Sequence, residues 1–484
     1  MSLIARIAKR IGNKSTFLIP TLLAGGLGLA AFSQPAFAQG TDRIDAAQRH
    51  SFLVVLDEQA VGLTGKGMAD RQRTHALTSR LTSDLAAHSG VRPSAVLGQL
   101  GMFVVEATRG EAKRLAGLPG VKLVEEDTLA MPSALPSCFA PTSFPLANSY
   151  NPTSPQAIQC WDPQLNCSDS WGLDRIDQHT GSQAAHTLDS LFHFTARGNG
   201  VHIYVVDTGL VATHSEFGLP GGGTRVGNGT NVAVTGQCRP NSNTCGDRPA
   251  WDTYDGSGHG TLVASIAAGL RFGVAKSATV HPVRISNDNG ASWTSWAASG
   301  LDWVAANASL PAVVNLSYNF PISPFGDTAA LDMAASRLIN NYGIAIVNSA
   351  GNSNSHAGSF SPTALPEVIV VAGLDWNNYT YGAGAPFSCS TPGCGTNYGT
   401  PVDFFAPAVD ILGAMGSSGQ SYACIGTGTS FAAPFATGVA AQYLQSNPLA
   451  TPAAVQTALI NKTTPSVVLG TLNGSPNRLL FTDF

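Results

Sequence analysis

Residues 201–209 read Val201-His-Ile-Tyr-Val-Val-Asp207-Thr-Gly209, an apolar run that ends in an acid and a turn. A short apolar run bounded by turn residues is typical of a buried strand in a parallel sheet. The pattern recurs, and we predict strands at 201–206, 280–285, 312–316, 344–348 and 368–372. Helix-compatible stretches alternate with them at 261–270, 295–307, 328–342 and 431–445. This alternation predicts an α/β fold whose mainly parallel central sheet is covered on both faces.

Polar residues at the carboxyl ends of such strands gather into one site. Three glycine-flanked segments qualify, and in chain order they are Asp207-Thr-Gly, Gly258-His259-Gly-Thr and Gly428-Thr-Ser430. Taken singly, the acid is often a helix cap, the histidine a structural residue and the serine a loop residue. The order Asp, His, Ser, with each residue in its own turn, instead predicts a nucleophilic triad.

In this triad Ser430 is the nucleophile, His259 is the base that takes its proton, and Asp207 fixes the tautomer of the histidine. Asn352, in the turn after strand 344–348, is a candidate oxyanion donor together with the backbone N–H of Ser430. The alternative reading of Asn352 is an ordinary turn residue.

Other reaction classes lack residues that they require. Asp207-Thr-Gly also matches half of an aspartic-protease site, but the chain has no second D-[ST]-G. Ser430 does not lie in a G-x-S-x-G elbow, the glycine run before it has no P-loop lysine, and H-E-x-x-H does not occur.

The amino terminus has the pattern of a secretory signal peptide, which we expect over residues 1–38. A basic start is followed by an apolar run at 17–32 and by Ala36-Phe-Ala38, a small-x-small cleavage site. The alternative is a membrane anchor, for which the run is short. We therefore expect a secreted protein, extracellular or periplasmic, without a membrane association after cleavage.

Composition excludes some partners and favours disulfides. The 484 residues are 44% hydrophobic and 12% charged, with 26 basic against 30 acidic side chains. A chain without a basic excess is a poor nucleic-acid binder. The eight cysteines of an exported chain favour disulfides, for which Cys238–Cys245 and Cys389–Cys394 are close in sequence. A zinc site is the rival, but no C-x-x-C occurs.

Residues 50–131 form a separate small α+β pattern. We predict strands at 50–56, 101–107 and 121–125, and helices at 67–88 and 109–117. A proline- and cysteine-rich segment follows at 134–170, before the alternating pattern that runs from 171 to 484.

At the triad segments the chain resembles the subtilisin-like serine proteases, in particular the branch of proteinase K and aqualysin. Trp171-Gly-Leu-Asp-Arg-Ile176 and Gly474-Ser-Pro-Asn-Arg478 match the two ends of that family's domain. The resemblance implies a subtilisin-like three-layer fold for residues 171–484 and an inhibitor propeptide at 39–133. It implies a serine endopeptidase that acts on polypeptides without a catalytic cofactor and cuts itself near residues 131–135. We expect a monomer that its own propeptide inhibits until that cut.

The resemblance also assigns binding residues. Asn352 falls on the family's oxyanion asparagine, and substrate would lie as a strand between two edges, which are Gly290, Ala291 and Ser292 on one side and Ser317, Tyr318 and Asn319 on the other. It implies structural calcium at two groups, which are Asp174, Asp177 and Gln178, and the carbonyls of Pro366 and Val368 with Asp403. The alternative for these acids is a helix cap or a surface charge.

The chain departs from the family near the substrate edges. Tyr318-Asn319-Phe320 stands where Leu-Gly-Gly is usual, and Leu262 stands where a second histidine is usual. Bulkier residues would narrow the pockets that read substrate side chains. The alternative function is therefore a weak or inactive protease-like binding protein. The family's usual cysteine positions do not match these eight, so its bridges cannot be transferred.

Overall fold

The central sheet of the computed structural model consists of strands that are buried along nearly their whole length. Its order is β12-β13-β11-β15-β17-β19-β20-β24-β23, parallel from β12 to β24, with only the terminal pair β24 and β23 antiparallel. The bounds are β11 His202–Asp207, β12 Thr230–Asn231, β13 Thr279–Arg284, β15 Ala312–Leu316, β17 Ala345–Ser349, β19 Ile369–Leu374, β20 Phe404–Pro407, β23 Thr464–Pro465 and β24 Arg478–Leu479. Strands buried on both faces require helices on both sides of the sheet.

The structure describes residues 48–63, 68–132, 137–138, 156–158, 161–162, 167–168, 171–181, 188–189, 191–219, 222–238, 242, 244–322, 330–382, 393–414 and 423–484. All of them belong to one compact unit, residues 46–484. The predicted signal peptide at 1–38 and most of the cysteine- and proline-rich segment at 134–170 lie outside the described residues.

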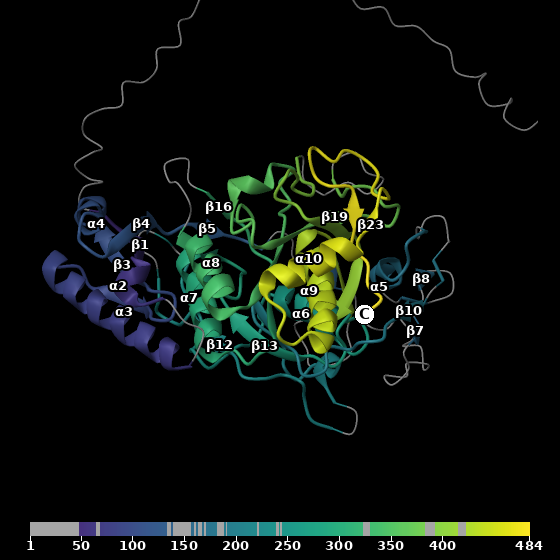
Figure 1. Ribbon diagram of the computed structural model, residues 1–484, viewed down its shortest axis with the longest axis horizontal. Coiled ribbons are helices and arrows are strands. Elements are labelled where there is room, and N and C mark those ends of the chain that lie inside the picture. Colours follow the sequence, from purple (N-terminus) through teal and green to yellow (C-terminus); the bar gives the residue numbers. More distant parts are fainter. Residues whose placement is uncertain are drawn as a thin grey trace, which may run out of the picture. The chain divides into compact units, whose positions relative to one another are not determined.

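Two pairs of helices supply the covering layers. Helices α6 (His259–Ala268) and α9 (Thr429–Ser446) pack on each other and on the sheet, and α7 (Thr294–Asn307) packs on α8 (Ala330–Tyr342). Helix α10 (Pro452–Lys462) packs on α9 and β17. Figure 1 shows the yellow α9 and α10 beside each other and α7 next to α8. The predicted α/β fold with a mainly parallel sheet is thus confirmed.

Shorter elements surround this sheet. Strand β16 (Phe320–Pro321) pairs with β18 (Phe360–Ser361), and β22 (Ala423–Gly426) pairs with β21 (Ile411–Ala414) and β6 (Ser137–Cys138). Helix α5 (Trp171–Ile176) is buried at every residue. The remaining short elements are β7 Gln156–Ile158 with β10 Leu191–His193, β8 Trp161–Asp162 with β9 Cys167–Ser168, and the 3-10 turns Ser215–Phe217 and Ala357–Ser359.

Residues 49–126 form an antiparallel sheet of their own, in the order β2-β3-β1-β4. The bounds are β1 Arg49–Leu56, α2 Glu58–Val61, α3 Met68–Ser89, β2 Pro93–Leu97, β3 Met102–Thr108, α4 Arg109–Ala116 and β4 Val121–Glu126. Helix α4 begins with a capping box between Thr108 and Glu111, which satisfies backbone N–H groups in both directions. The predicted elements are present here, and α2 and β2 are additions.

This N-terminal sheet contacts helices α7 and α8 through buried ionic groups. The Arg337 guanidinium of α8 donates to the carbonyls of Leu100 and Leu56. Asp302 of α7 accepts from the backbone N–H groups of Gln99 and Leu100 at 2.7 and 2.8 Å. The two parts of the chain are therefore joined by hydrogen bonds to the charged Arg337 guanidinium, which are stronger than neutral ones, and by hydrogen bonds to Asp302, whose pKa burial raises to about 7.

Helix α7 receives its N-terminal cap from this N-terminal part of the chain. Its own N-cap residue, Trp293, offers no side-chain hydrogen bond. Asp127, which follows β4, accepts from the Ser295 backbone N–H at 2.9 Å and from the hydroxyls of Thr294 and Ser295. The cap is thus supplied by a residue distant in sequence.

One predicted disulfide is present, between Cys238 and Cys245, and Cys394 is also disulfide-bonded. Cys389 lies outside the described residues. Among the helices that the structure describes, none has the length and apolar character needed to cross a membrane.

We predict that Asp127→Ala destabilises the full-length protein, because it removes hydrogen bonds to Ser295 and Thr294 and leaves the start of α7 without its cap. The expected loss is about 1–3 kcal/mol in the free energy of unfolding. Denaturant titration of the Ser430→Ala protein, in which self-cleavage cannot interfere, measures it. The control is Asp84→Ala on exposed α3. Equal stability of the two variants would contradict the capping role.

Candidate active site

Asp207 and His259 meet because a strand end and a helix start lie side by side. Asp207 is the last residue of β11, and His259 is the first residue of α6, preceded by Gly258 in the left-handed conformation at φ 86°. The ring nitrogen Nδ1 of His259 lies 2.7 Å from Oδ1 of Asp207, and both side chains are fully buried. The structure therefore brings together two of the three predicted triad residues in a direct hydrogen bond.

The acids around His259 favour its charged form. Burial by itself lowers the pKa of His259, but the charge of Asp207, its hydrogen bond and the charge of Asp255 outweigh burial, so the pKa is raised above its ordinary value. A carboxylate that stabilises imidazolium in this way suits a histidine that accepts a proton during a reaction. The other ring nitrogen, Nε2, is buried and makes no hydrogen bond within the described part of the chain.

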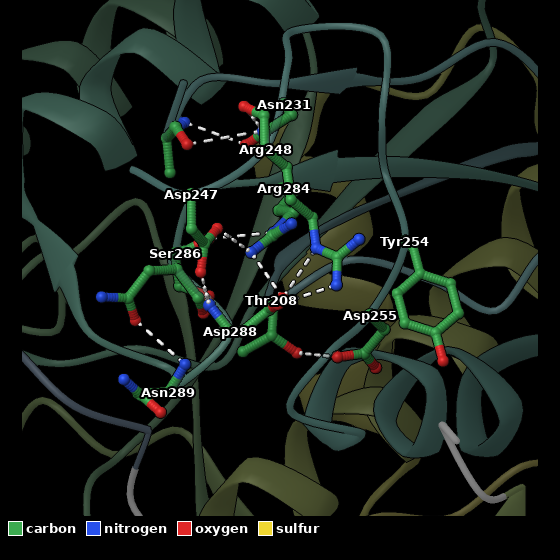
Figure 2. Close-up of polar contacts among 12 residues, drawn as sticks. Thr208, Asn231, Asp247, Arg248, Tyr254, Asp255, Arg284, Ser286, Asp288 and Asn289 are labelled. Carbon is green, nitrogen blue, oxygen red and sulfur yellow. Dashed lines mark hydrogen bonds and ion pairs between the residues drawn. The ribbon is translucent and has the colours of Figure 1, made fainter. Parts of the chain in front are cut away.

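Asp255 links Thr208, which follows β11, to the start of α6. Its role was not predicted from the sequence. Its carboxylate accepts from the Thr208 hydroxyl at 2.8 Å, a contact visible in Figure 2, and from the backbone N–H groups of Gly258 and Thr261. The Thr208 hydroxyl in turn accepts from the Gly260 backbone N–H. The sequence did contain a signal for this role. Asp255 stands shortly before a glycine turn that opens a helix, and acids at such positions often cap helices.

Ser430 lies in the first turn of α9, after Gly428 at φ 143°. Its hydroxyl is 3.4 Å from the carbonyl of Ser317, and its own carbonyl accepts from the Ser317 hydroxyl. The next residue, Phe431, has its ring 5.4 Å from the ring of His259, centroid to centroid. The serine is therefore in the same site as the histidine, but Nε2 of His259 is not hydrogen-bonded to it.

The side-chain amide oxygen of Asn352 is hydrogen-bonded to the start of α9, whereas its amide nitrogen is not. Its Oδ1 accepts from the Thr429 backbone N–H at 2.8 Å. Its Nδ2 is buried and has no partner among the described residues. A buried amide donor without a partner costs free energy, and its usual explanation is a function or a missing ligand. A Cβ on Gly428 would lie 3.0 Å from this Nδ2, so the N–H₂ group lies at the start of α9, close in sequence to Ser430.

The first predicted substrate edge is occupied by the chain itself. Strand β5 (Leu129–Ala130) pairs antiparallel with β14 (Ser292–Trp293), and β5 also contacts β16. Pro132 reaches Gly290 so closely that a Cβ on this glycine would lie 2.7 Å from the proline ring. The segment 129–132 thus lies along the edge that Gly290, Ala291 and Ser292 form.

Tyr318 and Asn319 of the second edge point into the protein. Tyr318 is fully buried, and its hydroxyl donates to the Gly290 carbonyl at 2.8 Å. Burial raises the pKa of Tyr318 well above its usual value, so it remains a donor. The Asn319 amide donates to the Ser349 carbonyl at 2.7 Å. The two edges are therefore joined by a phenol group that occupies space between them.

Two arginines, the buried Arg284 and the half-buried Arg248, support the turn that carries the first edge. The fully buried Arg284 binds both Asp247 and Asp288, and Arg248 makes two bonds to Asp288. Figure 2 shows these four side chains converging, with Asn289 on the turn beside them. A bidentate arginine–carboxylate pair fixes geometry as well as charge. The network thus fixes residues 284–289 in place immediately before Gly290.

The predicted metal ligands fall into two separate groups. Asp177 is 1% exposed and accepts from the backbone and ring of His193, while Gln178 donates to Asp174. In the second group, the carbonyls of Pro366 and Val368 and the carboxylate of Asp403 surround the side-chain amide nitrogen of Gln456.

Comparison with known proteins identifies the class. Residues 198–478 match the model of the subtilase family. The chain therefore belongs to the subtilase family, as its motifs predicted.

Named relatives agree with this assignment. The chain is 40% identical over 315 residues to an extracellular serine proteinase of Thermus sp. (strain Rt41A), covering 65% of this chain and 66% of that protein. It is 29% identical over 423 residues, 87% of this chain and 88% of the relative, to a subtilisin-like serine protease of Penicillium citrinum. A crystal structure of a cold-adapted subtilisin-like serine proteinase is 34% identical, with a TM-score of 0.52, covering 64% of this chain and 97% of that one.

We predict that Asp255→Asn lowers the pKa of His259, because it removes one of the negative charges that favour the imidazolium. Histidine NMR titration of the Ser430→Ala protein measures this pKa. The control is Asp252→Asn, whose carboxylate is paired with Arg248. A His259 pKa that stays constant, or rises, in Asp255→Asn while the control is normal would show that Asp255 does not act on the histidine.

Proposed function

We propose that this protein is a secreted serine endopeptidase that hydrolyses peptide bonds with Asp207, His259 and Ser430. The observation that carries the proposal is the fully buried Asp207–His259 pair, whose unpaired Nε2 belongs to the same site as Ser430. Membership of the subtilase family and relatives named serine proteases support it.

The proposed reaction has two halves, formation and hydrolysis of an acyl-enzyme, and the same three residues act in both. Ser430 attacks the peptide carbonyl carbon as His259 Nε2 takes the hydroxyl proton, and Asp207 stabilises the imidazolium. The imidazolium then gives that proton to the leaving amine, and an acyl-enzyme remains. Water then attacks the acyl carbon as the same histidine takes its proton, and the imidazolium returns that proton to the Ser430 Oγ as the ester bond breaks, which releases the acid and restores Ser430. The Asn352 Nδ2 and the Ser430 backbone N–H stabilise the negative oxygen in both halves.

We further propose that residues 39–133 are an inhibitory propeptide. The strand at Leu129–Ala130 pairs with the substrate edge in the way that a polypeptide substrate would add a strand. Asp127 and the Asp302 contacts hold the preceding domain against α7. We expect self-cleavage near residues 131–135, a stretch in which Pro132 lies against Gly290. Residues 134–170 would then precede the peptidase domain at 171–484.

Polypeptides are the proposed substrates, and Tyr318 is proposed to restrict them. Its ring and hydroxyl fill space between the two edges that would hold substrate. We therefore expect a preference for small side chains at the positions that face Tyr318.

Calcium is proposed as a structural ion at Asp174, Asp177 and Gln178. The fit rests on Asp177, whose Oδ1 is buried without a partner among the described residues. Those residues contain no group of three or more His, Cys, Asp or Glu side chains arranged for a metal. The side-chain nitrogen of Gln178 donates to Asp174 and Asp189 in this structure, so Gln178 could join the shell of a hard cation only with its amide turned to present the oxygen. Further oxygens would complete that shell. The ion would stabilise the fold by binding only the folded state.

The test of the function compares the purified precursor with its Ser430→Ala variant. We expect the wild type to lose its first 130 or so residues and to degrade casein, and the variant to do neither, because the nucleophile is missing. Intact mass and casein cleavage are followed over time. Ser446→Ala, an exposed serine at the far end of the same helix, is the matched control and should behave as wild type. Folded wild type that neither shortens nor cuts casein would overturn the proposal.

Asn352→Ala is predicted to lower kcat by about 10²–10³-fold with little change in KM, because an oxyanion donor acts in the transition state. Steady-state kinetics on a peptide amide measures the two constants.

Asn352→Asp separates this role from a structural one, because it keeps the acceptor for the Thr429 N–H but loses the donor. We expect it to be as slow as the alanine variant. Asn340→Ala, at an exposed position of α8, is the control. Wild-type activity in Asn352→Asp would show that only the bond to Thr429 matters.

A further inference from the structure

One side-chain nitrogen lies among four oxygen atoms at the junction of β19, β20 and α10. The Nε2 of Gln456 is 3.1 Å from the carbonyl oxygen of Pro366 and 3.5 Å from that of Val368. It is 3.3 and 3.4 Å from the two carboxylate oxygens of Asp403. We call these four atoms the oxygen cage. They are the group at which the family resemblance implied calcium.

The cage joins three parts of the central sheet and its covering layer. Pro366 and Val368 precede β19, Asp403 precedes β20, and Gln456 lies in α10. Asp403 also accepts from the Val370 backbone N–H at 2.8 Å, which ties β20 to β19. The Gln456 side chain connects helix α10 to these two strands. Whatever fills the cage therefore holds α10 to the edge of the two strands.

The cage does not fit calcium while Gln456 lies in it. Calcium takes six to eight oxygen ligands at about 2.3–2.6 Å, so it would need the position at which Nε2 lies. An amide N–H₂ carries two hydrogens and a partial positive charge. It can donate to two of the oxygens at a time and attract the others. Asp403 is half-buried, so its carboxylate requires donors from some source.

We propose that the Gln456 amide takes the place of a divalent cation in this cage, so that the junction of β19, β20 and α10 forms at any calcium concentration. The donor is covalently part of α10, which begins at a Thr451 cap with proline in the first turn. Its contribution to stability is then fixed by the fold, whereas that of a bound ion depends on the free ion concentration. This inference does not depend on the protein being an active protease.

The test measures calcium-induced shifts in the thermal unfolding midpoint, in EDTA and in millimolar calcium, for the full chain carrying Ser430→Ala. Asp403→Asn should lower the midpoint but leave the calcium-induced shift unchanged, because no ion binds at the cage. Asp177→Asn should remove the shift, because it disables the first group. If Asp403→Asn reduces the calcium-induced shift, the parent cage binds calcium and the proposal is overturned.

A second variant converts the cage into a cation site. Gln456→Glu places a carboxylate among the four oxygens, so the midpoint in EDTA should fall by about 3–8 °C. Calcium should restore it, which gives a larger calcium-induced shift than in the parent. Thr457→Glu, an exposed neighbour on α10, adds the same charge outside the cage and should keep the parental shift.

Gln456→Ala keeps the experiment decisive if the glutamate variant does not fold in EDTA. Removing the amide opens the cage, so calcium should again raise the midpoint more than in the parent. Equal calcium-induced shifts in the parent, Gln456→Ala and Thr457→Glu would show that the amide does not stand in for an ion.

Discussion

The structure depends on one constraint, that a carboxylate taken out of water must be met by donors. Asp207 and Asp255 are fully buried, and Asp403 is half-buried. Each is met by N–H groups or hydroxyls of neighbouring segments, and by His259 in the case of Asp207. Leaving such a charge without donors would cost several kcal/mol. Each acid therefore fixes the relative position of the segments that serve it, and Asp207 and Asp255 fix the geometry of the candidate site.

Much of the fold could be predicted because a parallel sheet covered on both faces has a simple sequence pattern. The strand expected at 312–316 has those bounds in the structure, and the other expected strands shift by one or two residues. Strand β20 and helix α10 were not predicted. Phe404-Phe-Ala-Pro407 is short and ends in proline, and α10 is weakly amphipathic with few buried residues. Their positions are decided by tertiary contacts, for which a local pattern carries no signal.

In the candidate site, too, residues with a local sequence pattern could be predicted, and residues placed by tertiary contacts could not. Asp207, His259 and Ser430 could be found from the sequence because each lies in a glycine turn that the chemistry requires. Asp255 and Gln456 could not be assigned, because their roles depend on segments distant in sequence that only folding brings close. The sequence indicated that Tyr318 would narrow the pockets. It gave no indication that the hydroxyl would bond to Gly290 and so join the two edges.

The cap that Asp127 places on α7 has a consequence for the order of folding and cleavage. The acceptor for the Ser295 N–H lies before the proposed cut, and the helix lies after it. If the N-terminal part is removed, water must replace Asp127 at that helix end. The shortened chain would then have a smaller driving force to form α7 than the precursor had. The shortened chain would stay folded because it unfolds slowly. Once unfolded, it would not readily refold, so cleavage makes folding effectively irreversible.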